Sequence, residues 1–252
     1  MILKKRAEEL EKMRRAGRVV GETLQILQEA VRPGVTTAAL DEIAEREIRA
    51  RGAVPSFKGY RGFPATICTS LNSEIVHGIP GKRALKDGDL IKLDCGAIVE
   101  GYHGDSAVTV AVGEVPPEAL KLIETTERSL QAGIAEARPG NRIGDIGAAV
   151  QTMAEGAGFS VVREYVGHGI GRALHEDPPV PNYGSHGKGL ALEPGLVIAI
   201  EPMVNVGSYE TRLLPDGWTV VTADGALSAH FEHTIAITED GPEVLTAVNG
   251  HG

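Results

Sequence analysis

The chain has 252 residues, of which 42% are hydrophobic and 23% charged, a composition typical of globular proteins that bury a large core. A net charge of −9 and an aromatic content of 4% disfavour nucleic acid as the main partner, because phosphates need a basic face and bases need aromatic platforms. Two cysteines do not make a disulfide framework. Because no segment looks like a signal peptide or a membrane span, we expect a cytoplasmic protein that binds neither DNA nor membranes.

Four amphipathic helices and several strands are predicted along the chain. The helices run from Leu10 to Val31, from Thr36 or Thr37 to Gly52, from Pro117 to Pro139-Gly140, and from Ile143 to Gly156 or Gly158. Short apolar runs predict strands at TICTSL (66–71), IKL (91–93), SAVTVAV (106–112), VIAI (197–200) and HTIAIT (233–238). Paired helices and grouped strands favour an α+β fold with a largely antiparallel sheet.

The two halves of the chain resemble each other. Arg32-Pro33-Gly34 recurs 106 residues later at Arg138-Pro139-Gly140, and ALKDGDLIKLD (84–94) aligns with ALEPGLVIAIE (191–201) at an offset of 107. His77-Gly78-Ile79 resembles 168–170 at an offset of 91, so the second half holds about 16 extra residues. These offsets predict a single pseudo-symmetric domain over 1–252, with halves of roughly 1–115 and 116–252.

Two acids occupy equivalent positions of this repeat. Asp94 and Glu201 each end an apolar strand in the sequence pattern, IKLD and VIAIE. A buried carboxylate is costly unless it is paired or binds a cation. A solvated strand end explains one such acid, whereas two equivalent acids favour a metal site.

Two further acids extend this candidate site. Asp105 follows Asp94 by eleven residues, a span that allows a hairpin, and Glu232 shares one strand face with Thr234 and Ala236. Four carboxylates repel one another, and two divalent cations balance their charge. An oxygen-rich set completed by one histidine suits Mn²⁺, Fe²⁺, Co²⁺ or Zn²⁺, and without thiolates it differs from structural zinc.

Five segments resemble those of type I methionine aminopeptidases of the short bacterial form, in the same order and with the same spacing, from about residue 5 to residue 248. The segments are CTSLNSEIVHGIP (68–80), IKLDCGAIVEGYHGDSAVT (91–109), GHGIGRALHEDPPVPNYG (167–184), IAIEPMV (198–204) and FEHTIAIT (231–238). The resemblance implies the pita-bread fold of peptidase family M24. It also implies a monomeric enzyme that removes the initiator methionine from new chains when the second residue is small.

The resemblance also assigns roles to residues. It implies that two divalent ions are held by Asp94, Asp105, His168, Glu201 and Glu232. Glu201 would also take the proton of the attacking water. His175 would contact the scissile carbonyl, and His77 would reach the peptide nitrogen of the residue after methionine. The methionine pocket would be lined by Tyr60, Phe63, Cys68, Leu174 and Trp218.

Some positions depart from the family or carry weaker implications. Arg61 stands where a histidine is commoner, and Phe57 replaces a frequent cysteine. Asn72 and Ser228 match a Na⁺ or K⁺ site of some members. Of the other histidines, His230 shares strand parity with Glu232, and His233 faces away from it. His103 is expected in a Gly-rich turn, and His186 and His251 are expected in loops.

The expected partners are peptides and the N-termini of nascent proteins. The charged residues between Lys4 and Arg18 read as a solvated helix face, with transient docking to the ribosome as the other interpretation. Three rival functions stay open. They are an Xaa-Pro aminopeptidase on the same fold, a non-catalytic pita-bread binding module, and a plain metal-binding or structural protein.

Overall fold

A computed structural model describes residues 3–248 of the chain, and all four predicted helices are present in it. The helices are α1 (Ala7–Ala30), α2 (Thr37–Ala50), α3 (Pro117–Glu136) and α4 (Ile143–Gly156), with a short 3₁₀ helix η1 at Tyr60–Gly62. The hydroxyl of Thr36 accepts a hydrogen bond from the Ala39 amide and so caps α2. None of the helices within 3–248 is long and apolar enough to cross a membrane.

The strands are short except for two long ones in the first half. They are β1 (Val54–Pro55), β2 (Ile67–Leu71), β3 (Glu74–Val76), β4 (Leu90–Val99), β5 (Tyr102–Ala111), β6 (Ser160–Val161), β7 (Gly167–Gly169), β8 (Glu176–Val180), β9 (Val197–Ile200), β10 (Met203–Asn205), β11 (Thr211–Leu213), β12 (Val220–Thr222), β13 (Ser228–His230), β14 (His233–Thr238) and β15 (Gly241–Val244). The predicted limits of VIAI and HTIAIT match β9 and β14.

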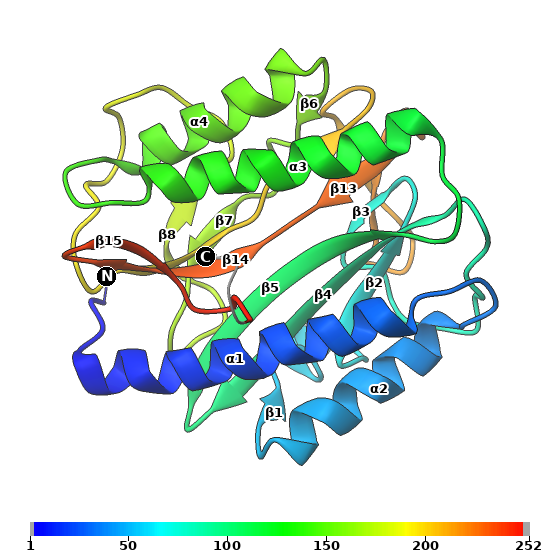
Figure 1. Cartoon of the computed structure of the whole chain (residues 1–252), viewed down its shortest axis with the longest axis horizontal. Helices are drawn as coiled ribbons and strands as arrows, with labels where there is room; N and C mark the ends of the chain where they lie inside the picture. Colours follow the sequence, from blue (N-terminus) through cyan, green and yellow to red (C-terminus); the bar gives the residue numbers. More distant parts are fainter. Residues whose placement is uncertain (1–2, 249–252) are drawn as a thin grey trace.

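Every strand pairing in the described chain is antiparallel, as expected for the α+β class. The ladders form four sheets, in which β4 pairs with β1, β2 and β5, and β14 pairs with β9 and β15. The helix pair α1–α2 lies over the strands of the first half, and α3–α4 lies over those of the second (Figure 1). An isolated bridge between Ala107 and Glu232 links the two halves.

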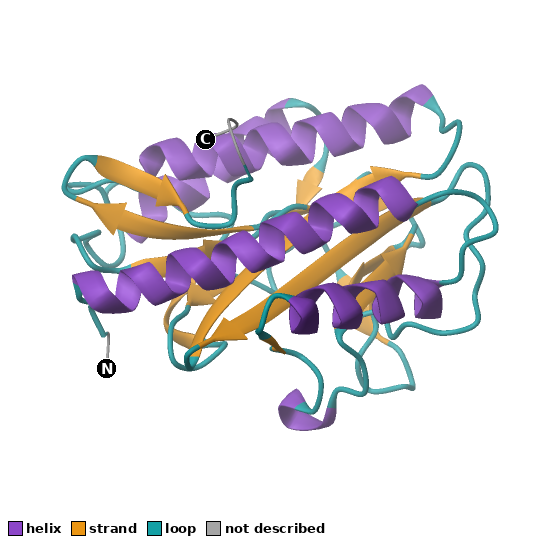
Figure 2. Ribbon diagram, turned by 60° about the horizontal axis from the view of Figure 1, so that its bottom comes forward, coloured by secondary structure: helices purple, strands orange, loops and turns teal. Residues whose placement is uncertain are grey.

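Helix α1 crosses β4 and β5 at close range, as Figure 2 also shows. A Cβ atom added at Gly104 of β5 would lie 2.8 Å from the Gly17 nitrogen of α1. Only residues without side chains allow the two backbones to approach this closely. The helix buries Met13, Val20, Leu24 and Leu27 against these strands and the rest of the core.

The structure corrects three local expectations on β4 and β5. Asp94 does not end its strand but lies in the middle of β4, and Asp105 lies inside β5 rather than at its start. The hairpin turn is confined to Glu100-Gly101, both with positive φ, so His103 is a buried strand residue and not part of a turn. A two-residue turn with positive φ at both positions matches the twist of the flanking strands, and the ladder therefore extends to Val99 and Tyr102.

Candidate active site

One cavity gathers every residue expected for the metal ions, the catalytic groups and the methionine pocket. It contains about 680 Å³ of empty space, counting the solvent at its mouth. Its lining comprises Tyr60, Phe63, Cys68, His77, Asp94, Asp105, His168, Leu174, His175, Glu201, Trp218 and Glu232, together with Phe57 and Arg61. The segments that supply these residues lie far apart in the sequence, and the fold brings them together.

The four acids reach the cavity from both halves of the fold. Asp94 and Asp105 lie on the paired strands β4 and β5, where Asp94 is opposite Ala107 and Asp105 is opposite Gly96. Glu201 directly follows β9, and Glu232 directly precedes β14. Since His233 pairs with Ile200, these two acids also meet across adjacent strands. The fold thus brings two antiparallel strand pairs side by side, with two acids on each, and the bridge between Ala107 and Glu232 joins them.

The acids are short of hydrogen-bond donors. Among the described residues, one oxygen of each of Asp94, Asp105 and Glu232 is buried without a hydrogen-bond partner. Burial raises the pKa of Asp94 to about 7, and burial followed by repulsion from the neighbouring acids raises the pKa of Asp105, Glu201 and Glu232. An unpartnered buried carboxylate is a strong destabilising feature. The cluster therefore has the electrostatic character of a cation site.

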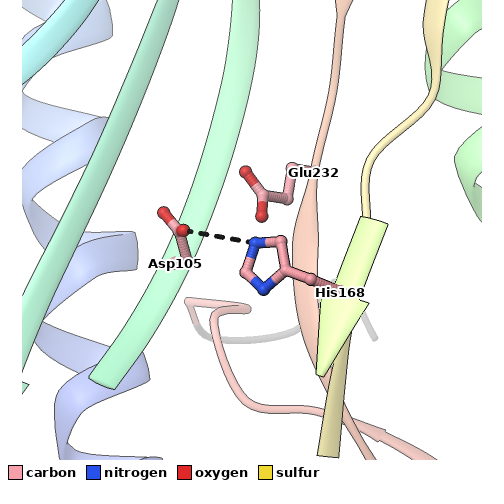
Figure 3. A group of neighbouring side chains, drawn as sticks. All are labelled: Asp105, His168 and Glu232. Carbon is pink, nitrogen blue, oxygen red and sulfur yellow. Dashed lines mark ion pairs between the residues drawn. The ribbon is translucent and has the colours of Figure 1, made fainter. Parts of the chain in front are cut away.

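His168 completes the cluster, and Figure 3 shows it pointing toward Asp105 and Glu232 from β7. Potential ligand atoms of these three residues lie within 4.8 Å of one another. The Nε2 atom of His168 lies 3.9 Å from Asp105 Oδ2 and 3.6 Å from Glu201 Oε1. Its Nδ1 atom is 2.9 Å from the Gly169 carbonyl, which can only accept a hydrogen bond. Nδ1 therefore carries the proton, and the lone pair of Nε2 faces two carboxylates.

That orientation fits a bound cation and little else. A lone pair directed at carboxylate oxygens needs a proton or a cation between them, and 3.6 and 3.9 Å are too long for a hydrogen bond. Burial lowers the pKa of His168 to about 3, so the ring is neutral near pH 7. The structure thus offers five ligand side chains of the type that divalent ions prefer.

Glu201 has neighbours that the sequence alone did not assign to the site. The Asn182 amide donates to the Glu201 carbonyl at 2.9 Å, and His230 Nε2 lies 3.7 Å from Glu201 Oε2. Both ring nitrogens of His230 are buried without a hydrogen-bond partner among the described residues. His230 could be placed near the acids from the sequence, because it is two residues from Glu232 and shares its strand face. No sequence pattern indicated the contact of Asn182.

The two histidines outside the acid cluster lie at the rim of the cavity. His175 Nδ1 is 2.9 Å from the Tyr60 hydroxyl, and its ring centroid is 4.3 Å from that of His168. Partial burial and the nearby charge of Arg61 lower the pKa of His175. His77 follows β3 with a φ of 62°, a conformation that costs a non-glycine residue free energy. Burial, with a smaller effect of His175, lowers its pKa to about 4, so His77 is neutral near pH 7.

An apolar wall stands beside the acids. Phe57, Phe63, Cys68 and Leu174 are buried in one cluster, and Tyr60 and Trp218 pack against it. The rings of Phe63 and Trp218 meet edge to face, with centroids 5.1 Å apart. Arg61 lies over the Tyr60 ring at 5.3 Å and is the lone lysine or arginine of the described lining. The cavity therefore has one charged end and one apolar side.

The remaining candidates lie elsewhere. Asn72 and Ser228 do not line this cavity but meet where the turn after β2 contacts β13. His233 faces away from the acids and contacts the Thr246 hydroxyl at 2.8 Å, as its strand parity predicted. His186 is exposed beside Asp145, and His251 lies outside the described residues.

Comparison with known proteins agrees with this geometry. Residues 11–239 match the model of metallopeptidase family M24. Methionine aminopeptidase 1 of Bacillus subtilis is 57% identical over 248 residues, which is 98% of this chain and 100% of the relative. A crystal structure of methionine aminopeptidase from Thermotoga maritima superposes with a TM-score of 0.97 at 43% identity, covering 98% of this chain and 100% of that one.

A more distant likeness concerns the fold alone. A prolidase from Pyrococcus furiosus has a TM-score of 0.80 at 22% identity, covering 98% of this chain and 66% of its own. The pita-bread fold expected from the sequence is thereby confirmed. The matches over nearly the whole length show that the chain belongs to metallopeptidase family M24 and, within it, to the methionine aminopeptidases.

Proposed function

We propose that the chain hydrolyses the peptide bond after an N-terminal methionine, in peptides and nascent proteins whose second residue is small. The observation that carries this proposal is the single cavity in which buried, unpartnered carboxylates adjoin an apolar wall. Relatives that share about half of its residues over almost the full chain are named methionine aminopeptidases, which supports the same reaction.

Asp94, Asp105, His168, Glu201 and Glu232 are the residues that would hold two divalent ions. Their four carboxylates and one neutral imidazole suit Mn²⁺, Fe²⁺, Co²⁺ or Zn²⁺. Such ions supply Lewis acidity and make a nucleophilic water accessible near neutral pH. Since each half of the chain provides part of the set, we propose that the two halves act as one catalytic domain.

Three side chains near the ions have separate roles in the proposed reaction. Glu201 takes a proton from the attacking water and passes it to the amine that leaves as the carbon–nitrogen bond breaks. His175, held by the Tyr60 hydroxyl, donates to the oxygen of the scissile carbonyl as negative charge develops there. His77 lies on the side of the second residue and contacts its peptide nitrogen. Both rings limit the space available to a bulky second side chain.

The apolar wall would bind the methionine side chain. Aromatic rings and the Cys68 thiol offer polarisable contacts to a thioether. Cys68 is buried, and burial raises the pKa of its thiol, so it stays protonated and acts as an apolar contact rather than as a nucleophile. The residues proposed to contact the methionine side chain are Tyr60, Phe63, Cys68, Leu174 and Trp218.

A peptide assay tests this function against its rivals. Metal-free protein is incubated with Met-Ala-Ser and with an Xaa-Pro peptide, with each of the four ions added in turn. We expect release of methionine from Met-Ala-Ser alone and only with an added ion. Cleavage of the Xaa-Pro peptide alone would establish the Xaa-Pro aminopeptidase instead. No turnover under any condition would contradict the proposed peptidase activity and favour the non-catalytic binding module.

The setting of the reaction is also proposed. Because the proposed substrates emerge from translation, the enzyme would act in the cytoplasm. It would be a monomer and would contact the ribosome transiently. The charged segment from Lys4 to Arg18, which includes the start of α1, supports the ribosome contact, because Lys4, Arg6, Arg15 and Arg18 are exposed. Sedimentation velocity with and without ribosomes measures the oligomeric state and the ribosome contact. A stable dimer would contradict the monomer, and an absence of co-sedimentation would contradict the ribosome contact.

A further inference from the structure

Lys92 is a buried lysine without a carboxylate partner. It lies on β4 two residues before Asp94, and it is 1% exposed. Its Nζ atom donates to two main-chain carbonyls, that of Asn72 at 2.7 Å and that of Ser228 at 3.0 Å. No carboxylate of the described residues forms an ion pair with it, and burial lowers its pKa to about 7. Such a lysine is rare, because a buried ammonium group normally has an acid beside it.

The two carbonyls belong to the residues to which the family resemblance assigned a Na⁺ or K⁺ ion. The polar groups of Asn72 are already engaged. Its main-chain oxygen also accepts from the Ser228 amide at 3.1 Å, its side-chain oxygen accepts from the Leu90 amide, and its side-chain nitrogen donates to Asp89. The Ser228 hydroxyl donates to the Val204 carbonyl. Unlike the acids of the cluster, neither Asn72 nor Ser228 has a buried side-chain oxygen without a hydrogen-bond partner, so these two residues have no free side-chain oxygen for a separate ion.

We propose that the Lys92 side chain takes the place of a monovalent cation, so that this chain binds neither Na⁺ nor K⁺ between Asn72 and Ser228. The argument depends on position, since the nitrogen fills the space between the two oxygens in either protonation state. The proposal differs from the expectation of a Na⁺ or K⁺ ion at these residues, and measurements in different salts decide between the two. The inference concerns a separate place in the fold and does not depend on the proposed peptidase activity.

The position of Lys92 gives this replacement a structural role. Its stem leaves β4, its nitrogen reaches the turn after β2 and the start of β13, and these segments come from different halves of the chain. Asp94 lies two residues farther along β4, and Glu232 lies four residues after Ser228. A covalently attached group cannot dissociate, so the junction between the acid-bearing strands becomes independent of the salt composition.

The test measures the thermal midpoint of metal-free protein in KCl, NaCl or tetramethylammonium chloride at equal ionic strength. For the natural chain we expect the same midpoint in all three salts. Binding of Tl⁺, a spectroscopic probe for K⁺ sites, should likewise be absent at Asn72 and Ser228. A saturable rise of the midpoint in KCl or NaCl, or a bound Tl⁺ at these carbonyls, would overturn the proposal.

Two substitutions sharpen the test. Lys92→Ala removes the nitrogen and leaves room for an ion, so its midpoint should fall by roughly 5–10 °C and recover in part with K⁺ or Na⁺ but not with tetramethylammonium. Lys92→Met keeps most of the stem volume, and its lower midpoint should not respond to any salt. An exposed control, Lys86→Ala, should match the natural chain. A Lys92→Ala protein that is stable but insensitive to K⁺ and Na⁺ would show that the place is no cation site. If Lys92→Ala does not fold, the measurements on the natural chain decide.

Discussion

Two buried polar regions of the fold contain oxygens that need a hydrogen-bond donor or a cation, and the two regions differ in whether the chain provides one. In the acid cluster around Asp105 and Glu232, carboxylate oxygens lack partners and the pKa values are raised by burial and mutual repulsion. At Lys92, main-chain oxygens are met by a nitrogen of the chain itself. The comparison teaches that orphaned oxygens mark a place for an exchangeable ion, whereas satisfied oxygens mark a place where a nitrogen of the chain already donates to them.

The largest expected effect comes from removing the group that moves the proton. Glu201→Gln should lower kcat on Met-Ala-Ser by roughly 1,000-fold while the fold persists, because general acid–base catalysis contributes about 10²–10⁴-fold. The matched control is Glu239→Gln, since Glu239 is exposed and follows β14 at the end of the strand opposite to Glu232. A Glu201→Gln protein with unaltered kcat would contradict the role given to this carboxylate.

Removal of divalent ions should weaken the acid cluster in a pH-dependent way. Burial raises the pKa of Asp94 from its ordinary value of 3.8 to about 7. The stability that a carboxyl with a raised folded pKa contributes is fully present below its unfolded pKa and is lost as the pH rises through the folded value. Metal-free protein should therefore lose stability, on the order of a few kcal/mol, between about pH 4 and pH 7.

Thermal unfolding with and without Mn²⁺ across this pH range checks the sign. The rise in midpoint caused by Mn²⁺ should grow with pH, because binding requires the deprotonated carboxylates. At Lys92, by contrast, we expect no effect of an added ion: the thermal midpoint of the natural chain should not change with the monovalent salt. An Mn²⁺ effect that is constant from pH 5 to pH 8 would contradict the account of the cluster.

A second buried lysine sharpens the comparison, because it does have an acid beside it. Lys5 Nζ lies 2.6 Å from Glu176 Oε2, and Glu176 directly follows His175. Lys5→Met should lower the free energy of unfolding by about 3 kcal/mol, since the Glu176 side chain, which is only 13% exposed, would lose its cation. The exposed pair of Lys4 and Glu193 provides the control, and Lys4→Met should cost less than about 1 kcal/mol. Equal losses in urea denaturation would remove the distinction between the two pairs.

The smallest effect is expected from the hydrogen bond that orients His175. Tyr60→Phe removes the hydroxyl 2.9 Å from His175 Nδ1 and keeps the ring in the pocket wall. A net hydrogen bond of about 1 kcal/mol corresponds to a fall in kcat of roughly fivefold with little change in KM. Tyr209→Phe, on an exposed ring, should leave both parameters unchanged. A changed KM with constant kcat would assign Tyr60 to binding alone.

The helices and the paired acids were predictable because their signals are local. Periodicity and capping residues set α1 to α4, and the repeat aligned Asp94 with Glu201. The lengths of β4 and β5 were not predictable, since Gly104 reads as a turn residue and its close contact with α1 is a tertiary feature. Lys92 was missed for a related reason, because its partners are main-chain carbonyls, which leave no trace in a sequence.

The central claim is that four carboxylates and one imidazole hold two divalent ions. Anomalous diffraction at the manganese edge, from crystals grown with excess Mn²⁺, tests it most directly. The account predicts two strong peaks within about 2.0–2.3 Å of ligand atoms from Asp94, Asp105, His168, Glu201 and Glu232, and no peak between Asn72 and Ser228. Absence of both peaks from the acid cluster, with its side chains turned away from one another, would contradict it.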